Sequence, residues 1–273
     1  MDIWLLIQAI IMGLVEGITE FLPISSTGHL ILTAQLLDFW TPEKREVFAV
    51  AVQIGAIAAV IYEYWGKLWG ALIGALRGED NGLRLALGLI VATIPIVILG
   101  LSFGDLIKQY LFNANTVAIA LIVGGVIILW AERRPRHIKE QEVEQIGLKK
   151  AMAIGLIQCF ALIPGTSRSG ATIIGGLLMG VSRKAAAEFS FFLGIPVLMG
   201  AGLLDLYKSH DILHTQDWLV LGVGMVTAFI SALIVIRALI RYVSNHDFTV
   251  FAWYRIIFGL LILITAYTGL IQW

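Results

Sequence analysis

Two stretches of the sequence decide the fold: EGITEFLPISSTGH at residues 16–29 and PGTSRSGAT at residues 164–172. Both lie in otherwise apolar regions and combine proline, glycine and hydroxyl side chains, which interrupt helices. The apolar segments that flank them are too short to cross a bilayer alone. Irregular backbone is tolerated at membrane depth where protein or a wet cavity surrounds it. The pattern therefore predicts two re-entrant helix hairpins, at residues 3–39 and 149–181.

The composition places the whole chain in a membrane. Of its 273 residues, 59% are hydrophobic and 14% are charged, and the mean hydropathy is +0.88. Soluble chains are about 45–50% apolar and roughly 25% charged, so a soluble domain is excluded. The net charge of zero gives no reason to expect nucleic acid as a partner. Membrane lipids are the expected surroundings.

Six further stretches have the length of about 20 apolar residues that a spanning helix needs. The sequence therefore predicts an all-α integral membrane protein. The predicted spans are at about 47–65, 84–104, 113–131, 186–206, 217–239 and 250–272.

The two halves of the chain resemble each other. Gly13-Leu14-Val15-Glu16 matches Gly155-Leu156-Ile157-Gln158, and each precedes a proline and a serine-rich turn. Each half holds one hairpin and three spans, and an odd number of spans reverses the orientation of the second half. We therefore expect an inverted-topology repeat. Its parts are 1–131, a linker at 132–148, and 149–273.

The numbers of lysine and arginine residues on the two sides of the membrane predict how the chain is oriented. With the linker in the cytoplasm, thirteen of the 19 basic residues lie on that side and four lie on the other. The positive-inside rule then places both termini in the periplasm and the linker in the cytoplasm. Gly66, Gly70 and Gly74 have a spacing that favours helix association, so a homodimer is a further expectation.

Glu16 and Glu20 are the leading candidates for chemistry, because charged groups in a membrane are costly and point to function. On a helix they share one face, about 6 Å apart. Two carboxylates this close need a divalent cation, a guanidinium or a shared proton between them. Mg²⁺ and Ca²⁺ both accept carboxylate ligands together with phosphate oxygens. A water-filled lining without chemistry is the alternative.

The first turn supplies Ser25, Ser26, Thr27 and His29. Hydroxyls and free amides at a helix start form an anion site. His29 is the only histidine predicted at membrane depth, and it could act on Ser26 as a general base or acid. Ordinary helix capping is the alternative interpretation.

The second turn supplies Ser167, Arg168, Ser169 and Thr172. An arginine with flanking hydroxyls is typical of phosphate binding, because its two-pronged donor geometry matches the phosphate oxygens. Arg168 could instead pair with Glu16 or Glu20, and the two interpretations are compatible. Of the other charged residues in or near spans, Glu188 is interpreted as interfacial, and Arg255 has no assigned role.

If the two turns converge, the combined residues suit phosphoryl transfer, in which cations neutralise the phosphate and a nucleophile attacks it. Membrane helices around such a site suit a lipid tail. A secondary transporter or flippase for phosphate or a polyprenyl-phosphate lipid is the alternative, since transporters share inverted repeats and broken helices.

Both turn motifs resemble the signature motifs of the bacterial undecaprenyl-pyrophosphate phosphatases, the bacitracin-resistance family. The resemblance covers the whole chain in length and span order. It implies an inner-membrane enzyme that converts undecaprenyl pyrophosphate to undecaprenyl phosphate, the lipid carrier for peptidoglycan. It further implies a site open to the periplasm, a divalent cation, and bacitracin resistance.

The resemblance also implies roles for individual residues. Glu16 and Glu20 would hold the metal or the pyrophosphate, Ser26 would be the nucleophile, and His29 its base or acid. The second turn would be the phosphate clamp. Water activated by the metal, or His29 itself, are the alternatives to Ser26 as the group that accepts the phosphoryl group.

Overall fold

The computed structural model describes residues 3–135, 137–208 and 210–269. In this part of the chain the regular elements are α-helices and short 3₁₀ helices, and it contains no β-strand. The prediction of an all-α protein is confirmed.

Six helices are long and apolar enough to cross a membrane, so the chain is a multi-pass membrane protein. They agree in order and position with the six predicted spans, although α5 extends well beyond both predicted ends. The last predicted residues of the sixth span, 270–272, lie outside the described residues. These helices are α3 (Pro42–Glu63), α5 (Asp80–Leu111), α6 (Ala114–Arg133), α9 (Arg183–Lys208), α10 (Asp217–Val243) and α11 (Thr249–Tyr267).

Shorter helices occupy the two predicted hairpin regions. The first region holds α1 (Ile3–Thr19) and α2 (Ser26–Leu36). The second holds α7 (Leu148–Gln158), the 3₁₀ helix η2 (Cys159–Leu162) and α8 (Arg168–Leu178). The chain therefore breaks at both motifs, as the proline, glycine and serine content predicts.

The same backbone conformation begins the second helix of each hairpin. Ser25 and Ser167 are the residues before α2 and α8, and their φ angles are 70° and 71°. Residues other than glycine rarely adopt positive φ, and those that do are held there by their surroundings, often at functional sites. The two turns, residues 20–25 and 163–167, are named below the first turn and the second turn.

One helix, α4 (Trp65–Leu76), is absent from the sequence prediction, which treats this segment as a connection between two spans. It folds back on α5, where a Cβ on Gly82 would lie 2.6 Å from the Ala71 carbonyl oxygen. Of the glycines considered for a homodimer, Gly74 packs against this contact, whereas Gly66 and Gly70 face open space.

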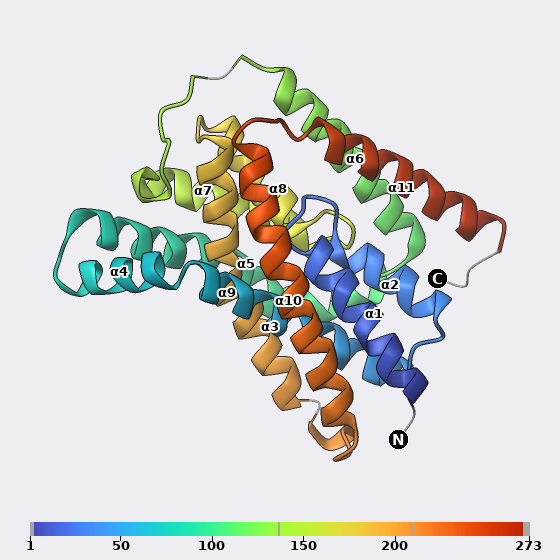
Figure 1. The fold of residues 1–273 in the computed structure, drawn as a ribbon. Helices are drawn as coiled ribbons and strands as arrows, with labels where there is room; N and C mark the ends of the chain where they lie inside the picture. The colour runs from blue at the N-terminus through green and yellow to red at the C-terminus, as the bar shows by residue number, and fades with distance from the viewer. Residues whose placement is uncertain (1–2, 136, 209, 270–273) are drawn as a thin grey trace.

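The hairpins lie deep in the bundle because glycines let their first helices approach other helices closely. A Cβ on Gly13 of α1 would lie 2.4 Å from the Gly224 carbonyl oxygen of α10. A Cβ on Gly155 of α7 would lie 2.4 Å from the Ala92 carbonyl oxygen of α5. Helices α6 and α11 run side by side as a separate pair that covers the turns (Figure 1).

Ion pairs tie the linker between the halves to the helices. Lys67 of α4 contacts Glu188 at 2.7 Å and Glu144 at 3.3 Å. Burial alone lowers the pKa of Lys67, but its hydrogen bonds to Glu188 and Glu144 and the charges of these residues raise it above the ordinary value. Glu188 is 4% exposed, so this pair compensates a buried charge.

Candidate active site

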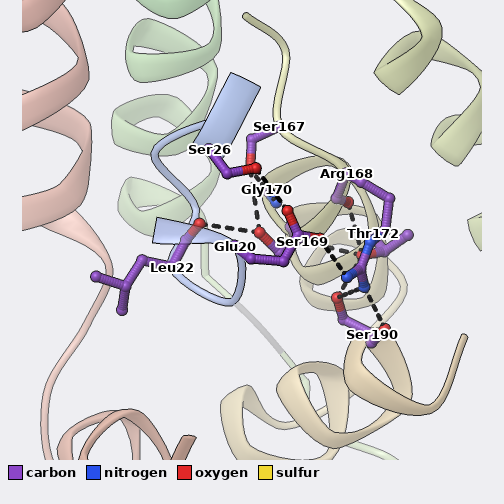
Figure 2. Close-up of polar contacts among 9 residues, drawn as sticks. All are labelled: Glu20, Leu22, Ser26, Ser167, Arg168, Ser169, Gly170, Thr172 and Ser190. Atoms are coloured by element: carbon purple, nitrogen blue, oxygen red, sulfur yellow. Dashed lines mark hydrogen bonds and ion pairs between the residues drawn. The ribbon is translucent and has the colours of Figure 1, made fainter. Parts of the chain in front are cut away.

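Glu20 joins the two turns. It lies just after α1 and is 7% exposed. Its Oε2 accepts a hydrogen bond from the Ser26 hydroxyl at 2.6 Å, and its Oε1 pairs with Nη2 of Arg168 at 2.8 Å (Figure 2). The sequence motifs, far apart in the chain, therefore meet on one carboxylate.

Arg168 is held by α9 as well as by Glu20. Its Nη1 donates to the carbonyl oxygen of Ser190 at 2.6 Å and lies 3.3 Å from the Ser190 hydroxyl oxygen. A Cβ on Gly194 would lie 2.8 Å from Nη2 of Arg168, so a glycine makes room for the guanidinium. The Nε of Arg168 is buried without a partner, which leaves one charged donor available to a ligand.

Hydroxyls of the second turn and of the first residues of α8 join this segment to its surroundings (Figure 2). Ser169 donates to the Leu22 carbonyl oxygen of the first turn at 2.9 Å. Ser167 accepts from the Gly170 amide at 3.0 Å, which caps α8. Thr172 donates to the Ser190 hydroxyl at 2.7 Å. These hydroxyls therefore position the turn and Arg168.

Glu16 is fully buried, and both of its carboxylate oxygens lack a hydrogen-bond partner. Gln158, which the sequence comparison of the two halves matches to Glu16, is also fully buried with both side-chain polar atoms unpartnered. An unpaired buried carboxylate is strongly unfavourable unless it binds a proton or a cation. Glu16 is thus a buried carboxylate whose two oxygens are both unpartnered in the hydrogen bonds of the described residues.

His29 faces α11. Its Nδ1 lies 2.8 Å from the Ser25 carbonyl oxygen and its Nε2 lies 2.6 Å from the Tyr254 hydroxyl. Its ring stacks on Phe258 with a centroid distance of 4.2 Å. The structure therefore brings Glu20, rather than His29, into hydrogen-bond contact with Ser26. Sequence reasoning missed Tyr254 and Phe258, because aromatic residues in a span carry no distinctive signal.

A cavity of about 210 Å³ lies between the turns. Its lining combines charged and polar side chains, among them Glu20, Arg168 and Gln53, with apolar ones. Its lining residues are Glu20, Ser25, Ser26, Thr27, Gln53, Ile96, Ala161, Leu162, Ile163, Pro164, Gly165, Ser167, Arg168, Val197 and Leu198.

The sequence reasoning missed Gln53, although a lone amide inside an apolar span is a signal that could have identified it. It also missed Ser190, which has no such signal. A larger hollow of about 760 Å³, between the start of α6 and the end of α11, has no charged lining residue among those described. Of these two cavities, the smaller one has a cationic group and a carboxylate among its described lining residues.

The acidic residues suit a metal only in part. Among the described residues, no three histidine, cysteine, aspartate or glutamate side chains gather in a way that could hold a metal ion. Glu20 is already engaged by Ser26 and Arg168, whereas Glu16 has two unpartnered oxygens. This donor set fits a cation that takes one or two carboxylates and completes its coordination with substrate phosphate oxygens, as Mg²⁺ does.

Comparisons with known proteins agree with this architecture. Residues 9–261 match the family described as bacitracin resistance protein BacA. Undecaprenyl-diphosphatase 1 of Acinetobacter baylyi is 66% identical over 274 residues, which covers 100% of both chains. The undecaprenyl-diphosphatase of Psychrobacter cryohalolentis is 62% identical over 98% of this chain and 97% of its own. These matches include both turns and all six long helices, and the chain belongs to the bacitracin resistance protein BacA family.

Proposed function

We propose that this protein hydrolyses undecaprenyl pyrophosphate to undecaprenyl phosphate and inorganic phosphate. The names of its full-length relatives support this reaction. The observation that carries it is Glu20, which binds the Ser26 hydroxyl with one oxygen and Arg168 with the other. A potential nucleophile, its proton acceptor and a phosphate-binding cation thus share one cavity.

The pyrophosphate binds among the charged and polar residues that line the cavity. Arg168 is the principal phosphate ligand, and its free Nε is available to a phosphate oxygen. Ser25, Thr27 and Ser167 line the cavity and provide neutral donors. Ser169 and Thr172 support the clamp by holding the second turn in place.

In the proposed reaction, the Ser26 oxygen attacks the terminal phosphorus and its proton passes to Glu20. The bond between that phosphorus and the bridging oxygen breaks, which releases undecaprenyl phosphate. Water then attacks the phosphorus of the phosphoserine, with His29 as the proposed base that takes the proton of this water. The bond between this phosphorus and the Ser26 oxygen breaks, Glu20 returns its proton to that oxygen, and inorganic phosphate is released. For this step, His29 exchanges its hydrogen bond with Tyr254 for one with water.

We further propose that a divalent cation, Mg²⁺ or Ca²⁺, takes part. Glu16 would hold it, with Glu20 beside it, and the unpartnered oxygens of Glu16 support this assignment. The cation would neutralise negative charge on the pyrophosphate.

The architecture that we propose is an inverted repeat with two re-entrant hairpins. The paired positive φ angles of Ser25 and Ser167 support it. So do the helix contacts, since α1 packs on α10 as α7 packs on α5. With the linker cytoplasmic, both termini and the opening of the site face the periplasm of the bacterial inner membrane. A homodimer remains a prediction, and the oligomeric mass in detergent tests it.

This reaction would recycle the lipid carrier for peptidoglycan synthesis, and the family description links it to bacitracin resistance. The relatives' names favour hydrolysis over the transporter alternative. A transporter would also have no need of a serine hydroxyl that donates to a carboxylate.

The test is phosphate release from undecaprenyl pyrophosphate by purified protein in detergent, with and without a chelator. We expect wild type to release phosphate, chelator to abolish the release and added Mg²⁺ or Ca²⁺ to restore it. Arg168→Ala should lose activity, whereas Arg241→Ala, at an exposed position on α10, should keep it. Folded wild-type protein that releases no phosphate with any cation would contradict the proposal, and lipid transport in liposomes would then be measured.

A further inference from the structure

Arg255, on α11, is a buried cation with no role in the proposed reaction. It is 1% exposed, and among the described residues no carboxylate pairs with it. Its guanidinium instead donates to four backbone carbonyl oxygens. These belong to Pro23 at 3.0 Å, Gly165 at 3.1 Å, Ala120 at 3.1 Å and Leu121 at 3.2 Å.

These contacts connect both turns to the pair of helices α6 and α11. Pro23 belongs to the first turn and Gly165 to the second, and each lies shortly before a serine with positive φ. Ala120 and Leu121 belong to α6, the partner helix of α11. One side chain therefore holds both turns against the α6–α11 pair.

Two glycines beside Arg255 leave the space that its guanidinium occupies. A Cβ on Gly124 would lie 2.1 Å from Nη2 of Arg255, and a Cβ on Gly170 would lie 3.0 Å from Nη1. Arginine has five N–H donors in a rigid plane, whereas lysine has a single ammonium that cannot reach four carbonyls spread around a plane. The variant Arg255→Lys therefore keeps the positive charge but loses the planar set of N–H donors, so it tests whether the donor geometry matters.

We propose that Arg255 is a positioning residue that fixes the first turn relative to the second, so that Glu20, Ser26 and Arg168 meet. This inference rests on the proposed phosphatase function. Arg255 acts through the backbone of the turns and touches none of these three side chains in the hydrogen bonds described. Because a displacement of about 1 Å at a reacting group can lower a rate about 10²-fold, loosening the turns is costly to catalysis.

Two variants disturb Arg255 in different ways, and each has a matched control. Arg255→Lys removes the planar donors, and Arg241→Lys makes the same change at an exposed site. Gly124→Ala keeps Arg255 but displaces its guanidinium, whereas a Cβ on Gly104, also within a helix, would contact nothing within 4 Å. We expect both test variants to lower kcat at least tenfold, with a smaller rise in KM, and Arg241→Lys and Gly104→Ala to stay within twofold of wild type.

A second readout does not depend on activity. Cys159 is the sole cysteine, and it begins η2, the segment that leads into the second turn. It is partly buried, and its thiol donates to the Gly155 carbonyl oxygen at 3.4 Å. If Arg255 restrains the second turn, maleimide should label Cys159 at least threefold faster in both test variants than in wild type and the controls.

The outcomes separate this proposal from the proposed function. If wild type releases no phosphate, the function fails, and Cys159 labelling alone decides the role of Arg255. If wild type is active and folded Arg255→Lys stays within twofold of it, the proposal is overturned. It is also overturned if activity falls while Cys159 labelling is unchanged. Should Arg255→Lys aggregate, Gly124→Ala decides by the same criteria.

Discussion

At the scale of single residues, the site depends on a carboxylate with two partners. One oxygen of Glu20 accepts the hydrogen bond of Ser26, and the other pairs with Arg168. In the proposed reaction, Arg168 also binds the phosphate while Glu20 takes the Ser26 proton. The ion pair would then take part in the mechanism as well as join the two turns.

Ser26→Ala tests the nucleophile. We expect kcat for phosphate release to fall about a thousandfold or more, since the group that bonds to phosphorus is lost. Thr166→Ala, which removes another hydroxyl beside the second turn, is the control and should stay close to wild type. A loss smaller than tenfold in Ser26→Ala would show that water or His29 attacks instead.

His29 and Tyr254 test the second step. His29→Ala should lower kcat about 10²-fold, which is typical for loss of a general acid or base. It should also let the phosphorylated enzyme accumulate in a rapid-quench experiment with labelled substrate. Tyr254→Phe should have a smaller effect, because it removes only the hydroxyl that holds His29 at 2.6 Å. Tyr110→Phe, at an exposed tyrosine of α5, is the control. Unaltered turnover in His29→Ala would exclude it as the base.

At the scale of helices, glycines determine how deeply the hairpins enter the bundle. Gly13 and Gly155 let α1 and α7 approach α10 and α5 until backbones touch. In membranes, small residues at helix contacts serve this purpose because packing drives association there. The turns reach the centre of the protein only because these contacts exist.

Gly155→Val should therefore move α7 away from α5. Its Cβ would lie 2.4 Å from a backbone oxygen, and overpacking of this kind costs about 1–3 kcal/mol. We expect a lower midpoint of thermal unfolding in detergent and reduced phosphate release. Gly200→Val on α9 is the matched control, because a Cβ there contacts nothing within 4 Å. Equal midpoints of thermal unfolding in Gly155→Val and Gly200→Val would contradict the role of Gly155 in the close packing of α7 on α5.

At the scale of the whole molecule, the cavity is too small for the complete substrate. About 210 Å³ is less than the 300–1,000 Å³ typical of pockets for drug-sized ligands, so a long isoprenyl tail must lie outside it. In the proposed complex, the apolar lining would accommodate only the part of the tail nearest to the pyrophosphate, and the remainder would stay in the surrounding lipid.

Tail length should consequently affect kcat little. Between undecaprenyl and farnesyl pyrophosphate in the same detergent, we expect kcat to differ less than tenfold, because the reacting groups and the first isoprene unit are identical. Apparent KM can differ more, since the tail sets how the substrate partitions into micelles. Substrates without any tail, such as inorganic pyrophosphate, should react far more slowly. A steep dependence of kcat on length beyond farnesyl would contradict this view.

The sequence by itself determined the six membrane spans, the breaks at residues 16–29 and 164–172, and the residue types of the site. These follow from local physics, because hydropathy, proline and strings of hydroxyls act within a few neighbouring residues. The tertiary structure alone decided that Glu20 pairs with Arg168, that His29 faces Tyr254 and that Arg255 holds both turns. Each of these contacts joins residues at least 90 positions apart. Helix packing brings these residues together, and local sequence patterns carry no information about it.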